Sequence, residues 1–81
     1  MQMSRAALRG REYFTHDRWV ALIGRIRSEY LEMPGLRLTV AQAARLWAED
    51  RQITERLLDE LTVTGFLHKD RAGAYLRASL A

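Results

Sequence analysis

Three polar side chains near the start of one predicted helix have the chemistry to recognise the base edges of a nucleic acid. Arg51, Gln52 and Arg56 fall within the first two turns of this helix. Arginine can bond to guanine O6 and N7, and glutamine can bond to adenine N6 and N7. The alternative is a solvated helix face stabilised by i,i+4 ion pairs. Here those pairs would join Arg51 to Glu55 and Arg56 to Glu60.

Three further basic side chains can contact phosphates if the helix binds duplex DNA. Arg45 lies on the preceding predicted helix, and Lys69 and Arg71 lie in a predicted hairpin. Phosphate contacts position a protein on DNA without reading its sequence. Ordinary surface solubility explains these three residues equally well. The candidate DNA-binding residues are therefore Arg45, Arg51, Gln52, Arg56, Lys69 and Arg71.

The other reactive side chains form no catalytic or metal-binding pattern. His16 and His68 are the only histidines, they lie far apart, and the chain has no cysteine. A metal site is therefore not expected. Asp59 and Glu60 are helix neighbours that point in different directions, so they do not form an acid–base pair. Since no triad or phosphate-binding glycine loop is present either, we expect neither an enzyme nor a cofactor.

Helical spacing of apolar residues predicts a first helix from about Thr15 or Asp17, either of which can cap it, to about Met33. Pro34-Gly35 ends it. The apolar stripe consists of Trp19, Val20, Leu22, Ile23, Ile26, Tyr30 and Met33. Trp19 could pack beneath the hairpin, and a very short edge strand is expected over residues 36–38.

Two more helices are predicted from their caps. Thr39 and Gln42 form a capping box that starts a helix ending near Trp47. Asp50 caps the third helix, residues 51–64, and Gly65 follows its end. Its expected inner face is Ile53, Leu57, Leu58 and Leu61. From the coinciding stripes we expect Ile26, Trp47, Leu57 and Leu61 to be buried together.

A hairpin is predicted after the third helix. Residues 66–69 and 74–77 read as its strands, and residues 70–73 as its turn, with Gly73 able to adopt a positive φ. In the preceding region, Ala44 is small, Ala48 occupies the turn, and Asp50 is the polar cap.

These elements, with the run LLDEL at 57–61 and Gly65-Phe66-Leu67, resemble winged helix-turn-helix regulators of the short MarR-like type. The resemblance covers about residues 18–78. It implies a mainly α (α+β) winged helix, with a three-helix helix-turn-helix core and a C-terminal β-hairpin wing. It also implies DNA binding through the third helix.

The chain departs from that family in three respects. Thr54 stands where a bulky aliphatic residue is usual, with Ile53 one residue early, and the wing is very short. The third helix with its cap is also acidic. It contains two arginines and four carboxylates, a net charge of −2; the carboxylates are Asp50, Glu55, Asp59 and Glu60. Negative charge opposes binding to phosphate, although glutamate can accept from a cytosine amino group.

The basic charge is concentrated near the N-terminus. The net charge is +3, but residues 1–27 hold six arginines against two acids, and residues 28–81 hold seven basic groups against eight acids. We expect residues 1–16 to form a flexible basic segment and residues 17–81 to form the domain. The segment could also be a basic arm on DNA or, as a distant alternative, a transit peptide. Tyr13 and Phe14 could cover a partner subunit or the end of the first helix.

The sequence favours a small transcriptional regulator that binds duplex DNA. We expect its partners to be the DNA and a second copy of the chain in a homodimer. The alternative is a winged-helix protein-interaction module without DNA affinity, docking through its acidic third helix or its N-terminal segment. RNA binding through the first helix is a weaker third class. No apolar run approaches the roughly 20 residues that span a bilayer, and the lack of cysteine fits a cytoplasmic protein.

Overall fold

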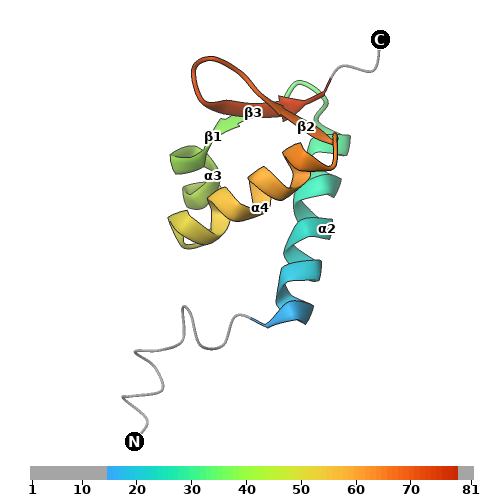
Figure 1. Cartoon of the computed structure of the whole chain (residues 1–81), viewed down its shortest axis with the longest axis vertical. Helices are drawn as coiled ribbons and strands as arrows, with labels where there is room; N and C mark the ends of the chain where they lie inside the picture. The colour runs from blue at the N-terminus through green and yellow to red at the C-terminus, as the bar shows by residue number, and fades with distance from the viewer. Residues whose placement is uncertain (1–14, 79–81) are drawn as a thin grey trace, which may run out of the picture.

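The computed structural model describes residues 15–78 of the chain. Within that range it contains three helices and one three-stranded antiparallel sheet, with the strand order β1-β3-β2 (Figure 1). The elements are α2 (His16–Glu32), β1 (Arg37–Thr39), α3 (Val40–Leu46), α4 (Arg51–Val63), β2 (Leu67–Lys69) and β3 (Ala74–Arg77). This α+β arrangement is compatible with a winged-helix layout. We call β2, β3 and the turn between them the wing.

All three helices begin at the caps expected from the sequence. Thr15 is the N-cap of α2 and His16 is its first residue, so the helix begins one residue before the expected domain boundary at residue 17. Residues 1–14, including Tyr13 and Phe14, lie outside the described range. Thr39 Oγ1 accepts from the Gln42 N–H at 3.2 Å, and Gln42 Oε1 accepts from the Thr39 N–H at 2.9 Å. This reciprocal pair is the predicted capping box.

Two turns depend on residues with positive φ. Gly65, which follows α4, has φ 89°, and Gly73 in the wing turn has φ 86°. The turn between α3 and α4 instead places Ala48 at φ 50°. A side chain with a Cβ pays about 1–2 kcal/mol in this left-handed region. The backbone of this turn therefore suits glycine better than the alanine that the chain carries.

The four residues expected to share a core do so. Ile26, Trp47, Leu57 and Leu61 belong to one buried cluster. Its other buried members come from the three helices and from both wing strands: Tyr30, Ala43, Leu58, Leu67 and Tyr75. Removing these side chains from water supplies the main driving force for folding.

The inner face of α4 differs from the expected one. Ile53 is only half-buried at the edge of the core, and Thr54 is fully buried instead. Thr54 Oγ1 donates to the Asp50 carbonyl at 2.8 Å. This bond to its own helix gives the buried hydroxyl a hydrogen-bond partner, so it needs none from the surrounding core side chains. The observed inner face is Thr54, Leu57, Leu58 and Leu61.

Two smaller expectations also need correction. Strand β1 lies one residue later than predicted, because Thr39 both ends the strand and caps α3. The prediction that Trp19 packs beneath the wing is wrong. Figure 1 shows that the first turn of α2 lies at the end of the helix far from the wing. Trp19 is half-buried against the core cluster from that side.

Candidate nucleic-acid interface

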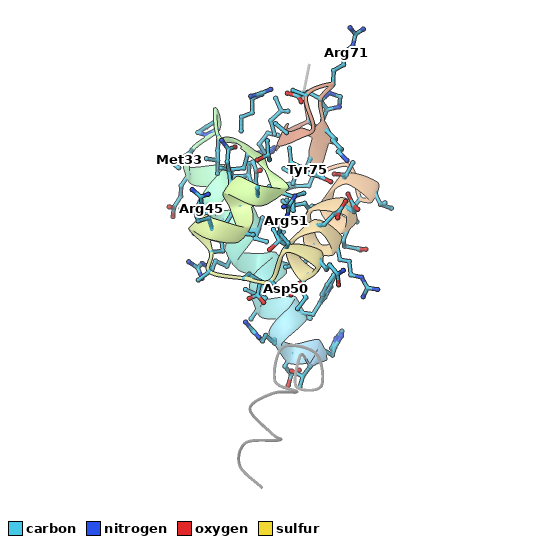
Figure 2. All side chains as sticks on the ribbon, turned by 90° about the vertical axis from the view of Figure 1, so that its left-hand side faces the viewer. Met33, Arg45, Asp50, Arg51, Arg71 and Tyr75 are labelled. Atoms are coloured by element: carbon cyan, nitrogen blue, oxygen red, sulfur yellow. The ribbon has the colours of Figure 1, made fainter. Side chains whose placement is uncertain are left out.

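The six candidate side chains are all exposed and come from three separate elements. Arg45 lies in the last turn of α3, the next three lie in the first two turns of α4, and the remaining two lie in the wing. Figure 1 shows α3, the start of α4 and the wing turn on the same side of the molecule. Figure 2 looks onto this side, with Arg45 and Arg51 on the helices and Arg71 extending away from the wing tip.

The arginines of the candidate set have no ion-pair partner in the part of the chain that the structure describes. Between residues 15 and 78, no carboxylate lies within ion-pair distance of Arg45, Arg51, Arg56 or Arg71. The i,i+4 pairs that would have explained α4 as a stabilised solvent face are therefore not formed. Ion pairs in the described range join other residues: Arg18 with Glu49, Arg25 with Glu29, and Arg37 with Asp70.

Lys69 differs from the other basic candidates because its ammonium group contacts an aromatic ring of the protein. It lies opposite Tyr75 in the β2–β3 register. Its Nζ is 5.4 Å from the centroid of the Tyr75 ring, within the range of a cation–π interaction. Lys69 therefore stabilises the wing in addition to adding positive charge, whereas Arg71 projects from the turn.

Two of the four carboxylates of α4 and its cap have structural roles. Asp50 Oδ1 accepts from the Ile53 N–H at 3.0 Å and caps the helix. Asp59 Oδ1 accepts from the Tyr75 hydroxyl at 2.6 Å, which attaches α4 to the middle strand of the sheet. Among the residues that the structure describes, Glu55 and Glu60 have no hydrogen-bond or ion-pair partner. The acidic charge of this helix is thus partly structural.

Tyr75 is fully buried beneath this part of the helix. Burial raises the pKa of its phenol most, and the hydrogen bond to Asp59 and the charges of Asp59 and Glu55 raise it further. This contact between wing and helix has no signal in local sequence spacing, since Asp59 and Tyr75 are 16 residues apart.

The turn between α3 and α4 is fixed to α2 by two polar contacts. Arg18 Nη2 donates to Glu49 Oε1 at 2.6 Å, and the Glu49 side chain is only 8% exposed. The Trp47 indole N–H donates to Glu29 Oε1 at 3.0 Å. These contacts hold the start of α4 in a defined position relative to the body. Sequence reasoning missed both because the partners are 31 and 18 residues apart.

The wing turn is built around Asp70. Its Oδ1 accepts from the N–H groups of Ala72 and Ala74, and its Oδ2 lies 2.7 Å from Arg37 Nη2. The Ala74 hydrogen bond is the largest of the effects that lower the pKa of this carboxyl, and Arg37 and Ala72 add to it. Asp70 thus pairs with Arg37 and the turn backbone, and Arg71 has no ion-pair partner between residues 15 and 78.

The opposite end of the wing is stabilised by two arginines that flank one aromatic ring. The guanidinium carbons of Arg27 and Arg77 each lie 4.5 Å from the Phe66 ring centroid. The Phe66 ring in turn meets Tyr30 edge-on, with centroids 6.5 Å apart. These contacts connect α2, the start of the wing and its last strand.

No group of three or more histidine and acidic side chains within residues 15–78 is placed to hold a metal ion. In the same part of the chain, no helix has the length and apolar character needed to cross a membrane.

The chain matches no protein-family model, no curated protein and no solved structure.

Proposed function

We propose that the chain is a winged helix-turn-helix domain, similar to short MarR-like regulators, that binds duplex DNA and regulates transcription. The observation that carries this proposal is a set of arginines without an ion-pair partner between residues 15 and 78, three of which, Arg45, Arg51 and Arg71, lie on the side of the molecule that Figure 2 faces. Arg45, Arg51 and Arg56 belong to the two helices, and Arg71 belongs to the wing tip. Phosphate neutralisation by such side chains supplies most non-specific affinity for DNA.

In this proposal the start of α4 enters the major groove. Arg51 and Gln52 then face base edges, and Arg56 lies one turn further along the helix. Arg45 and Arg71 lie on either side of this helix end and contact phosphates, which fixes the protein on the duplex. One small module covers little DNA, so we further propose that two copies bind neighbouring half-sites as a homodimer.

The direct test is a binding titration of labelled random-sequence duplex DNA at low salt, followed by fluorescence anisotropy. The wild type should bind, and the double variant Arg51→Gln/Arg56→Gln should bind several-fold more weakly. Arg25→Gln is the matched control, because it removes an exposed arginine from α2, away from the candidate interface. The double variant removes two charges and the control removes one. A loss in the logarithm of affinity that is half as large in Arg25→Gln as in the double variant would therefore mean that only total charge matters, and it would contradict the proposed interface.

A protein-interaction module without DNA affinity is the second candidate. It is favoured by the net −2 charge of α4 with its cap and by two exposed apolar side chains at the ends of α3 and α4. Leu46 is 52% exposed and Val63 is 82% exposed. If this candidate is correct, the wild-type protein binds no duplex in the titration above, even at low salt. Val63→Ser then weakens the interaction with the partner.

A further inference from the structure

Glu55 is an exposed carboxylate without a structural role in the described part of the chain. Asp50 caps α4, and Asp59 binds the Tyr75 hydroxyl, but Glu55 accepts no hydrogen bond there. Arg51, one turn earlier, is suitably spaced for an ion pair with Glu55 and does not form one. The Glu55 carboxylate is thus available for an external hydrogen-bond donor.

Helix geometry places Glu55 in the middle of the proposed base-reading surface. Viewed along an α-helix, each residue is turned by about 100° from the previous one. Glu55 is therefore turned by about 40° from Arg51, and Gln52 is turned by about 100° from Arg51. Glu55 projects between these two side chains, one turn further along α4. If Arg51 and Gln52 reach base edges, the Glu55 carboxylate enters the same groove.

A carboxylate in a groove lined by phosphates is unfavourable unless it meets a hydrogen-bond donor. The donors on the major-groove edges of the bases are the amino groups of cytosine and adenine. Adenine carries the N7 acceptor beside its amino group, and N7 repels a carboxylate. Cytosine presents the N4 amino group without an acceptor on the same base edge. Cytosine is therefore the base that Glu55 fits best.

We infer that Glu55 determines base specificity: its carboxylate accepts from the N4 amino group of a cytosine in the major groove. The same charge weakens binding to duplexes that lack cytosine at this position, so Glu55 lowers non-specific affinity. The negative charge of Glu55 thus increases the difference in affinity between duplexes with and without cytosine at this position. This inference rests on the proposed DNA-binding function and adds the base that the site requires.

The test is selection of bound sequences from a random duplex library by three proteins: wild type, Glu55→Gln and Glu60→Gln. The wild-type pool should show cytosine at one position, preferred on the order of tenfold over other bases. Glu55→Gln should lose this preference and shift toward adenine, which glutamine recognises. It should also bind random duplex more tightly than the wild type.

Glu60→Gln is the matched control, because Glu60 is also exposed and unpartnered within residues 15–78. It removes the same charge from the same helix and should keep the cytosine preference. If Glu55→Gln selects the same cytosine as the wild type, the inference is overturned and DNA binding stands. If the wild type retains no duplex at low salt, both the inference and the proposed function are overturned.

Discussion

The Tyr75 hydroxyl on β3 donates a 2.6 Å hydrogen bond to Asp59 Oδ1 on α4. Tyr30 on α2 donates from its own hydroxyl to the Tyr75 carbonyl at 2.8 Å. Tyr75 thus connects the sheet to both long helices, and its phenol connects the wing to the proposed recognition helix. The position of the wing relative to α4 depends on this contact.

Replacing Tyr75 with phenylalanine should lower the free energy of unfolding by about 1–2 kcal/mol, as expected for a hydrogen bond to a charged group that water can partly replace. Urea unfolding measures this loss. Asp59→Asn keeps a neutral acceptor for the same hydroxyl and should cost less than Tyr75→Phe. An unchanged free energy for Tyr75→Phe would show that the contact contributes nothing to stability.

Ala48→Gly should stabilise the protein by up to about 1 kcal/mol, because glycine adopts the positive φ of this turn without the penalty that alanine carries. The gain is smaller than the full penalty, since glycine also loses more chain entropy on folding. Ala21→Gly is the control: this exposed residue of α2 has ordinary helical neighbours, and its replacement should cost about 1 kcal/mol. If both variants lose stability, the turn is not strained at Ala48.

Thr39→Ala should lower the free energy of unfolding by about 1 kcal/mol, because it removes the side-chain acceptor at the start of α3. Thr39→Ser retains the hydroxyl and should preserve most of the stability. Thermal unfolding of the three proteins compares them directly. Equal losses in the alanine and serine variants would assign the effect of Thr39 to its methyl group rather than to capping.

Stability should fall at alkaline pH. Burial raises the pKa of Tyr30 from 10.0 to about 12. Above pH 10 the unfolded chain loses this proton first, so stabilisation is complete below that pH and is lost as the pH rises toward 12. Tyr75 acts in the same direction. Each such tyrosine contributes at most about 1.4 kcal/mol per pH unit.

Urea unfolding at several alkaline pH values tests this expectation, with Tyr30→Phe as the comparison. The variant starts from a lower stability but should lose less with rising pH than the wild type. A steeper or identical decline in the variant would show that Tyr30 ionises normally in the folded protein.

The sequence predicted the elements that depend on neighbouring residues. The capping box of Thr39 and Gln42 lies within one helical turn, and the positive φ of Gly73 belongs to one short turn, so the sequence predicts both. The sequence does not predict polar contacts between residues that are far apart along the chain. Nothing in the spacing of Arg18 and Glu49 indicates that they meet.

The candidate interface was predictable only in part. The exposure of Arg51 and Arg56 follows from helical periodicity. Whether they form i,i+4 ion pairs depends on where their side chains lie, and only the structure shows that these pairs are absent within residues 15–78. The burial of Thr54 ran against the expected aliphatic pattern, because bonding of its hydroxyl to the Asp50 carbonyl lowers the cost of placing it in the core.

The most direct test of DNA binding is the salt dependence of the affinity for a duplex, measured for the wild type and Arg71→Ala. We expect the logarithm of the binding constant to fall linearly with the logarithm of salt concentration, by about 0.9 per neutralised phosphate. The slope of Arg71→Ala should be shallower by about 1, because this variant loses one phosphate contact at the wing tip. Absence of binding at about 50 mM salt, or an affinity that does not change with salt, would contradict the account.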